Sequence, residues 1–445
     1  MNTAQRSTPS PPPVFFASMI GSCAECGSEA LEGALQAQEA SHAGSCATCA
    51  ERREALRGYW RALGNPPEET DRLGVDARAR SRLRAVFASF AERGPHRPLV
   101  LPSALKIEVT NRCNLRCAHC LAGSHRGARG ELGLNEIGSL LAQAREMGVR
   151  TVALVGGEPL LRKDLPQIVD RVCNRGLAFS VSTNAVLATP ELAAELKRPN
   201  LMKVSVSLDG TKAFHDELRG CKGAHAAAVR GIRTLVEAGI DVAVAMVVAR
   251  SNWGMIGEVL ETACAAGAHY FVINDLIPTG RGDDMRAQCL DAEEYRELTE
   301  RMRGFRHQYR DRIDILWKGM RCEGPPDNER GHFFTSKCGA ALTELTIDPE
   351  GFVLPCPFLP TTSENVRSRP LKQIWYHSGD LRPYQNRRNL RGGCGQCDLA
   401  LSCSGCRARA LAHTGDSHGP DIRCPRCEGS LSAERGPVQI EEPHP

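Results

Sequence analysis

The chain has 445 residues, a length that predicts roughly two to four domains with substantial cores. Its 56 basic and 52 acidic residues leave a formal net charge of +4, which argues against a nucleic-acid-binding surface. No apolar run is long enough for a membrane span, and the opening residues 1–13, rich in proline and serine, resemble neither a signal peptide nor an anchor. We therefore expect a cytoplasmic protein. In that reducing compartment the 20 cysteines, many paired as C-x2-C, indicate metal sites rather than disulfides.

The first group of cysteines lies near the N-terminus. It forms a C-x2-C-x19-C-x2-C pattern of Cys23, Cys26, Cys46 and Cys49. Four thiolates in two such pairs are typical of a closed tetrahedral zinc site, and a further iron–sulfur cluster is the alternative. We expect a zinc-binding module over residues 1–62, with a role in folding or docking, and a helical linker over 63–103.

A second group follows an apolar, β-branched run at 105–110 that predicts a strand. Its members, at C-x3-C-x2-C spacing, are Cys113, Cys117 and Cys120. Three thiolates on a short loop can hold three irons of a [4Fe-4S] cluster and leave the fourth iron open to a small molecule. The alternative is a set of structural cysteines or part of a zinc site.

A second buried strand is expected at 152–155, ahead of a helical pattern over 163–175. Between them lies the run Gly156, Gly157, Glu158 and Pro159. Two glycines let a backbone pass close to a ligand, and Glu158 offers an acceptor for an ammonium group. Taken alone, the run is equally compatible with an ordinary strand-to-helix turn.

Further apolar strands alternate with helical patterns along the chain. The strands are expected at 179–182, 204–208, 242–248 and 271–273, and the helices include 226–238 and 253–266. This alternation predicts an α/β fold with a parallel sheet, in which ligands lie at the carboxyl ends of the strands. The segment 277–282, IPTGRG, leaves the last of these strands; it is suited to binding a carboxylate or a peptide backbone, with a solvated turn as the alternative.

The C-terminal region holds the third group of cysteines. Cys338 and Cys356 are followed by a C-x2-C-x5-C-x2-C run and a final pair, comprising Cys394, Cys397, Cys403, Cys406, Cys424 and Cys427. Zinc knuckles are one interpretation of this pattern. The four cysteines that stand apart are expected to be small core or surface residues: Cys173, Cys221, Cys264 and Cys289.

The loop of Cys113, Cys117 and Cys120, followed by GGEP, resembles the radical S-adenosylmethionine (radical SAM) superfamily. The resemblance implies a partial (β/α)6 TIM-like barrel over 104–290 with SAM across its top. It places the SAM methionine group at Gly156, Gly157, Glu158 and Pro159. It also makes candidate SAM contacts of His119, Ser182, Asn184, Ser207 and Asp209. Helix N-caps, and for His119 a loop histidine bonded to backbone, are the alternatives.

The C-terminal cysteines resemble a SPASM domain, which carries two auxiliary [4Fe-4S] clusters, although Cys403 and Cys406 are one residue closer than the family pattern. The resemblance implies a SPASM domain over 336–430. We expect a bridging segment over 291–335 before it and a disordered tail over 431–445 after it. The resemblance assigns the first auxiliary cluster to Cys338, Cys356 and Cys406, with Cys322 as the fourth ligand; an open fourth iron is the alternative, because Cys322 lies farther from Cys338 than the family pattern has it. It assigns the second to Cys394, Cys397, Cys403 and Cys424, with Cys427 as a substitute.

The expected activity is reductive cleavage of SAM to a 5'-deoxyadenosyl radical, with electrons from a donor such as flavodoxin or ferredoxin. The radical then takes hydrogen from an unactivated carbon, in a ribosomal peptide or protein substrate. The alternative is a dehydrogenase or epimerase of a small molecule such as a sugar, an aminocyclitol or a tetrapyrrole. A non-catalytic metal-bound interaction protein is the alternative of another class, and the presence of all three loop cysteines and Glu158 argues against it.

Overall fold

The computed structural model describes residues 101–124, 130–317, 338–397, 400, 403–424 and 426. Those from Pro102 on belong to one compact unit. Several predictions from the sequence lie outside the described residues. They concern the N-terminal module with Cys23, Cys26, Cys46 and Cys49, the linker up to residue 100, Cys322, Cys427 and the C-terminal tail.

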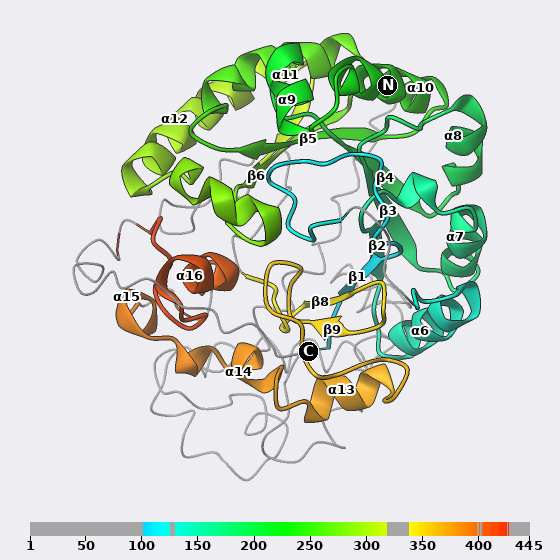
Figure 1. The fold of residues 1–445 in the computed structure, drawn as a ribbon, viewed down its shortest axis with the longest axis vertical. Helices are drawn as coiled ribbons and strands as arrows, with labels where there is room; N and C mark the ends of the chain where they lie inside the picture. Colours follow the sequence, from blue (N-terminus) through cyan, green and yellow to red (C-terminus); the bar gives the residue numbers. More distant parts are fainter. Residues whose placement is uncertain are drawn as a thin grey trace, which may run out of the picture. The chain divides into compact units, whose positions relative to one another are not determined.

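Six parallel strands follow one another across a single curved sheet (Figure 1). They are β1 (Ala104–Glu108), β2 (Thr151–Val155), β3 (Ala178–Thr183), β4 (Leu201–Ser207), β5 (Val242–Val248) and β6 (Tyr270–Asp275). Each pairs in parallel with the next strand along the chain. The six strands expected from the sequence are therefore all present, and the partial barrel is confirmed.

Helices connect these strands and cover the outer face of the sheet (Figure 1). They are α6 (Leu134–Glu146), η1 (Pro159–Leu161), α7 (Leu165–Cys173), α8 (Pro190–Leu196), α9 (Lys212–Leu218), α10 (Ala224–Glu237), η2 (Trp253–Met255) and α11 (Ile256–Ala265). Their apolar stripes are buried against the strands; α7, for example, buries Leu165, Ile168, Val169 and Val172. These contacts place the helices on one face of the sheet.

The inner face of the sheet is lined by small and polar side chains that stay accessible. Ser182 is exposed and Ser205, its register partner on β4, is half-buried, whereas the alternating residues Val204 and Val206 are fully buried toward the helices. Ser207, paired with Ala245 on β5, is also half-buried. Among the described residues of β3 and β4, these serines therefore remain accessible at the inner face.

Residues beyond the expected barrel extend this sheet at both edges. The 3-10 helix η3 (Gly280–Gln288) follows β6. The segment expected to bridge two domains then contributes α12 (Ala292–Tyr309) and β7 (Asp314–Leu316), and β7 pairs with β6. At the other edge β8 (Glu344–Ile347) pairs in parallel with β1, and β9 (Val353–Leu354) pairs with β8 antiparallel. The cysteine-rich C-terminal segment therefore shares the sheet of the barrel.

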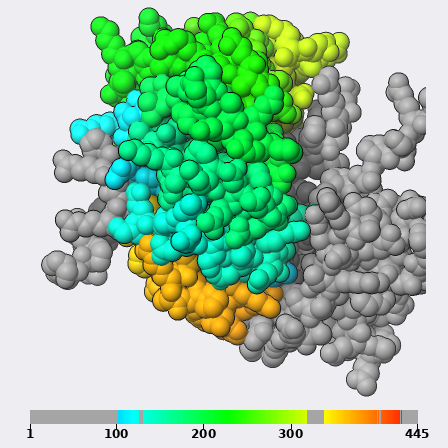
Figure 2. Space-filling model, turned by 90° about the vertical axis from the view of Figure 1, so that its right-hand side faces the viewer, coloured from blue at the N-terminus to red at the C-terminus, as the bar shows by residue number. Residues whose placement is uncertain are grey.

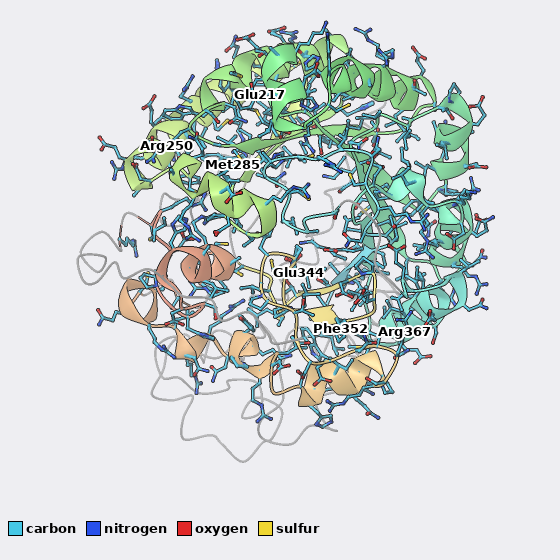
Figure 3. The ribbon with its side chains drawn as sticks, in the orientation of Figure 1. Glu217, Arg250, Met285, Glu344, Phe352 and Arg367 are labelled. Atoms are coloured by element: carbon cyan, nitrogen blue, oxygen red, sulfur yellow. The ribbon has the colours of Figure 1, made fainter. Side chains whose placement is uncertain are left out.

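The rest of that segment contains short helices, and its first part packs beside α6. Its helices are α13 (Leu371–His377), α14 (Arg382–Gln385), η5 (Arg387–Asn389), α15 (Gly392–Gly395) and α16 (Arg407–Thr414). Arg367 forms an ion pair with Glu136 of α6, Nε to Oε1 2.6 Å, and the Leu371 amide donates to Gln143 at 2.8 Å (Figure 3). Figure 2 shows this segment, in orange, against the cyan surface of α6. No helix in the described part of the chain has the length and apolar character needed to cross a bilayer.

Candidate active site and auxiliary metal centres

The loop that carries Cys113, Cys117 and Cys120 leaves the carboxyl end of β1 and is held by three separate segments. The Glu158 amide donates to the Arg112 carbonyl at 2.7 Å. The Ala118 amide donates to the carbonyl of Leu218, the last residue of α9, at 2.8 Å. The Arg281 amide donates to the Cys120 carbonyl at 3.0 Å. The segment 277–282 therefore packs on the cysteine loop rather than forming a solvated turn.

Two glycines allow these close backbone approaches. A Cβ atom on Gly157 would lie 2.2 Å from the Arg112 carbonyl oxygen, and one on Gly280, whose φ is +58°, would lie 2.1 Å from the Leu121 carbonyl oxygen. Such contacts are too short for any side chain. Glycine at these positions follows from the packing of GGEP and of IPTGRG on the loop.

The three loop cysteines share one small apolar group. Cys117 is buried with Leu115 and Ala224, and Cys113 and Cys120 pack against them, as does Cys221. Burial raises the pKa of the Cys113 thiol to about 11, so thiolate formation there requires a compensating positive charge or a metal. In the described part of the chain no three His, Cys, Asp or Glu side chains converge on one ion. A four-iron cluster makes no such demand, because its thiolates bind different irons.

Glu158 is fully buried and connects the ends of β2 and β3. One carboxylate oxygen accepts from the Thr183 hydroxyl at 2.6 Å and the Leu160 amide at 3.0 Å, and the other accepts from the Asn184 amide at 2.7 Å. Burial raises its pKa, against the lowering effect of these donors. The side chain expected to meet the SAM ammonium group is thus also part of the framework of the site.

We expect Glu158→Gln to lower the free energy of unfolding by about 1–3 kcal/mol, because an amide NH2 would face one of these donors and leave it unpaired. Weaker SAM binding at unchanged iron content should accompany this loss if Glu158 also serves the ligand. Chemical denaturation and a SAM titration measure the two effects, with the exposed Glu195→Gln as the control. If Glu158→Gln binds SAM with wild-type affinity, the role of Glu158 is structural only.

The other candidate SAM contacts lie around the same end of the sheet in different environments. Ser182 and Ser207 are on the accessible inner face, and Asn184 is buried and donates to Asn114 of the cysteine loop at 2.8 Å. His119 is largely buried, and burial lowers its pKa to about 4. Its Nδ1 atom has no hydrogen-bond partner within the described structure, so one polar atom of this side chain is left for a ligand.

Asp209 faces protein groups and reveals a residue that the sequence did not indicate. Its carboxylate accepts from Arg219 Nε at 2.7 Å and from the Val247 amide at 2.9 Å. Arg219 in turn points Nη1 at the Cys117 sulfur, 3.5 Å away. Arg219 and Cys117 are 102 positions apart in the chain, so no spacing rule could have paired them.

The predicted ligands of the first auxiliary centre come together in the C-terminal segment. Cys338, Cys356 and Cys406 pack around the same apolar group of Ala340, Leu359 and Ala408. Burial raises the pKa of the Cys356 thiol to about 12, and the nearby Lys106 ammonium of β1 opposes that shift. Lys106 also pairs with Glu344 of β8, Nζ to Oε2 3.2 Å, near the middle of the view in Figure 3. The barrel therefore supplies a cation to this centre.

The predicted ligands of the second auxiliary centre lie beside those of the first. The pKa of Cys403 is raised by burial and by the neighbouring acidic groups Asp421, Cys424 and Cys394. Buried Arg407 points Nη2 at the Cys394 sulfur at 3.6 Å, and Arg426 Nη1 lies 3.9 Å from the Cys397 sulfur.

The short spacing between Cys403 and Cys406 is accommodated by a tight turn. Ser404 and Gly405 both take left-handed backbone conformations, with φ of 64° and 58°. A Cβ on Gly405 would lie 2.8 Å from Asp421 Cβ and 3.3 Å from the Cys394 sulfur. The missing residue is therefore compensated by backbone geometry that still directs the two cysteines to different groups.

One buried carboxylate links both groups to the barrel. Asp421 accepts from the Cys406 amide at 2.7 Å and from Arg409 Nη1 at 2.9 Å, and its carbonyl accepts from the Cys424 amide at 2.9 Å. Arg409 Nη2 reaches Asp275, the last residue of β6, at 3.1 Å. Burial alone would raise the pKa of Asp421, but Arg409 and Arg423 hold it well below its usual range.

The sequence profile of the radical SAM superfamily matches residues 107–263, and that of the SPASM iron–sulfur cluster-binding domain matches 338–398. The chain belongs to the radical SAM superfamily and carries a C-terminal SPASM domain, as the cysteine motifs predicted. It is an enzyme that binds SAM with an iron–sulfur cluster, and its SPASM domain holds auxiliary iron–sulfur clusters.

The chain is similar to relatives of two kinds, a heme synthase and a peptide maturase. The AdoMet-dependent heme synthase of Nitratidesulfovibrio vulgaris is 32% identical over 335 residues, covering 71% of this chain and 90% of that protein. The mycofactocin maturase MftC of Mycolicibacterium smegmatis is 32% identical over 353 residues, covering 77% and 88%. Among solved structures, Streptococcus suis SuiB bound to its precursor peptide SuiA shares the fold with a TM-score of 0.63, at 20% identity, over 79% of this chain and 81% of SuiB.

Proposed function

We propose that this enzyme uses SAM to remove a hydrogen atom from an unactivated carbon of a ribosomally made peptide or protein, as part of an oxidative modification. The observation that carries the proposal is the joint placement of the three loop thiols and the GGEP turn at the carboxyl ends of β1 and β2. When bound to Cys113, Cys117 and Cys120, a [4Fe-4S] cluster supplies the electron that splits SAM into methionine and a 5'-deoxyadenosyl radical.

The chain's own residues hold and orient the reactants. Gly156, Gly157 and Pro159 shape the turn that brings Glu158 to the SAM ammonium group. His119, Ser182, Asn184 and Ser207 are the proposed contacts to the rest of SAM, and Asp209 acts on the site through Arg219. The accessible inner face then positions one C–H bond of the substrate beside SAM.

A peptide suits the inner face, because peptide amides need hydrogen-bond partners when they leave water. Ser180 and Ser205 supply hydroxyl groups on two neighbouring strands, beside the serines proposed to contact SAM, and Asn274 on β6 adds an exposed amide. The similarity to a mycofactocin maturase supports the same substrate class.

A second candidate is oxidation of a tetrapyrrole side chain. The similarity to an AdoMet-dependent heme synthase, which spans 90% of that protein at 32% identity, favours it.

For the metal centres, we propose two auxiliary [4Fe-4S] clusters and one zinc. The first cluster takes Cys338, Cys356 and Cys406 with Cys322; the second takes Cys394, Cys397, Cys403 and Cys424, with Cys427 as a substitute. The zinc takes Cys23, Cys26, Cys46 and Cys49 in the module over 1–62. An electron donor such as flavodoxin or ferredoxin serves the cluster of the barrel, and the segments 104–290 and 336–430 are its radical SAM and SPASM domains.

The test is anaerobic reconstitution with iron and sulfide, followed by reduction with dithionite in the presence of SAM. We expect 5'-deoxyadenosine, about twelve irons and about one zinc per chain. Deletion of residues 1–61 should remove the zinc and keep the iron. Absence of 5'-deoxyadenosine from protein with a full iron content would refute the proposed chemistry, and about four irons would exclude clusters in the SPASM domain.

The substrate class is tested by two additions to the reconstituted enzyme. A short peptide encoded beside the gene should increase 5'-deoxyadenosine formation. The mass of the peptide should fall by the mass of two hydrogen atoms for each modification. An iron porphyrin is the competing substrate. Turnover with the porphyrin and none with the peptide would transfer the assignment to tetrapyrrole chemistry.

A further inference from the structure

Arg219 is a buried cation that touches both a candidate cluster ligand and an anchored carboxylate. It lies directly after α9, and only 7% of its surface is exposed. Nη1 points at the Cys117 sulfur at 3.5 Å, while Nε and Nη2 both lie within 2.7 Å of Asp209 Oδ2. Its carbonyl also accepts from the Arg116 amide of the cysteine loop at 3.2 Å.

Asp209 holds Arg219 in this orientation and is itself fixed from several elements. Its carboxylate accepts from the Val247 amide of β5, its carbonyl accepts from Asn252 Nδ2 at 2.8 Å, and its amide donates to His215 Nδ1 at 3.1 Å. A guanidinium held by a buried carboxylate has little freedom to leave the sulfur.

We propose that Arg219 is a positioning residue that hydrogen-bonds the Cys117 thiolate and raises the reduction potential of the cluster held by the loop, while Asp209 limits the size of that increase. The inference rests on the proposed function, because it requires a cluster at Cys113, Cys117 and Cys120. It concerns how readily one electron from a reductant enters that cluster. It does not assign Arg219 a contact with SAM.

The direction follows from electrostatics. Reduction adds one negative charge to the cluster, so a cation or a hydrogen-bond donor at a ligating sulfur stabilises the reduced form more than the oxidised form. A nearby carboxylate has the opposite effect, and in this site Asp209 partly neutralises Arg219. Both side chains are buried, so solvent screens neither charge fully.

Two substitutions should therefore shift the midpoint potential in opposite directions. Arg219→Gln removes the cation and should make the potential more negative. A tenfold decrease in the equilibrium constant of the one-electron reduction corresponds to a shift of about 59 mV. Asp209→Asn keeps an acceptor for Arg219 but removes the negative charge, and it should make the potential more positive. Arg219→Lys keeps the charge without the planar fork, and we expect an intermediate value.

The measurement is an EPR-monitored redox titration of the full-length reconstituted protein with dithionite and mediators. The signal that changes when SAM is added identifies the cluster of the barrel among the three. Iron content is checked for each variant. Arg312→Gln is the control, because Arg312 makes a comparable arginine–carboxylate pair with Glu261 at the surface, far along the chain from the cysteine loop.

Opposite shifts for Arg219→Gln and Asp209→Asn at wild-type iron content would establish the inference. Unchanged potentials, or shifts of the same sign, would overturn it, because a purely structural pair gives no sign reversal. If Arg219→Gln or Asp209→Asn loses iron, the potential of Arg219→Lys is the deciding measurement. A wild-type potential in Arg219→Lys also overturns the proposed hydrogen bond. The wild-type protein is also assayed for SAM cleavage. If it cleaves SAM normally but the potentials of the variants do not change, the inference about Arg219 fails while the proposed function stands.

Discussion

Cys117→Ala is expected to reduce 5'-deoxyadenosine formation to the background level, and Cys113→Ala and Cys120→Ala should do the same. The three thiols are the proposed protein ligands of the cluster in the barrel, and they share one buried apolar group at the end of β1. Removing one leaves two, which cannot hold three irons of a cluster whose fourth iron must remain open to SAM. The iron held by the C-terminal cysteines should remain. Anaerobic assay of 5'-deoxyadenosine and iron analysis on the same preparation measure both quantities.

Cys221→Ala provides the matched control for this result. Cys221 packs against the same apolar group as the loop cysteines but lies outside their motif. We expect nearly normal SAM cleavage from Cys221→Ala. This result would exclude a change of packing alone as the cause of the lost activity in Cys117→Ala. Normal 5'-deoxyadenosine from Cys117→Ala would mean that the electron reaches SAM from some other centre, and the proposed ligand set would be wrong.

The double variant Cys394→Ala with Cys397→Ala is expected to lose about four of about twelve irons and to stop product formation while SAM cleavage continues. A substrate radical must give up an electron to become a crosslink, a carbonyl or an alkene. The C-terminal cysteines are joined to the carboxyl end of β6 through Asp421, Arg409 and Asp275. Iron analysis and the ratio of product to 5'-deoxyadenosine are the measurements.

The matched control is Cys173→Ala with Cys264→Ala, which removes two thiols from helices α7 and α11, outside all three groups of cysteines. This control should keep its iron and its product ratio. A normal product ratio from the Cys394 and Cys397 variant, despite its lost iron, would show that the second auxiliary centre is not needed for oxidation. The reaction would then be redox-neutral, such as an epimerisation, or the electron would leave by another route.

Local sequence patterns were sufficient for the elements of the barrel and for the groups of cysteines. The alternation of buried strands with amphipathic helices is a short-range signal, and it placed all six strands within three residues of their observed starts. The same holds for Cys113, Cys117 and Cys120, because ligands on one short loop are close together whatever the rest of the chain does.

Contacts between distant segments could not be obtained in this way. The pairing of β8 with β1 joins residues about 240 positions apart, and no strand at 344–347 was expected from the sequence. For the same reason the segment 291–335 was expected only to bridge two domains, although its described part adds α12 and β7 to the sheet.

By itself, then, the sequence determined the chemical class of this protein, because its metal-binding side chains are grouped at short spacings that few other sites use. Only the tertiary structure decided which charges surround those side chains. Arg219 beside Cys117, Lys106 near Cys356 and Asp421 between Cys406 and Cys424 come from separate elements brought together by the sheet. Charge interactions depend on distance and burial in the folded chain, and neither can be read from the order of the residues.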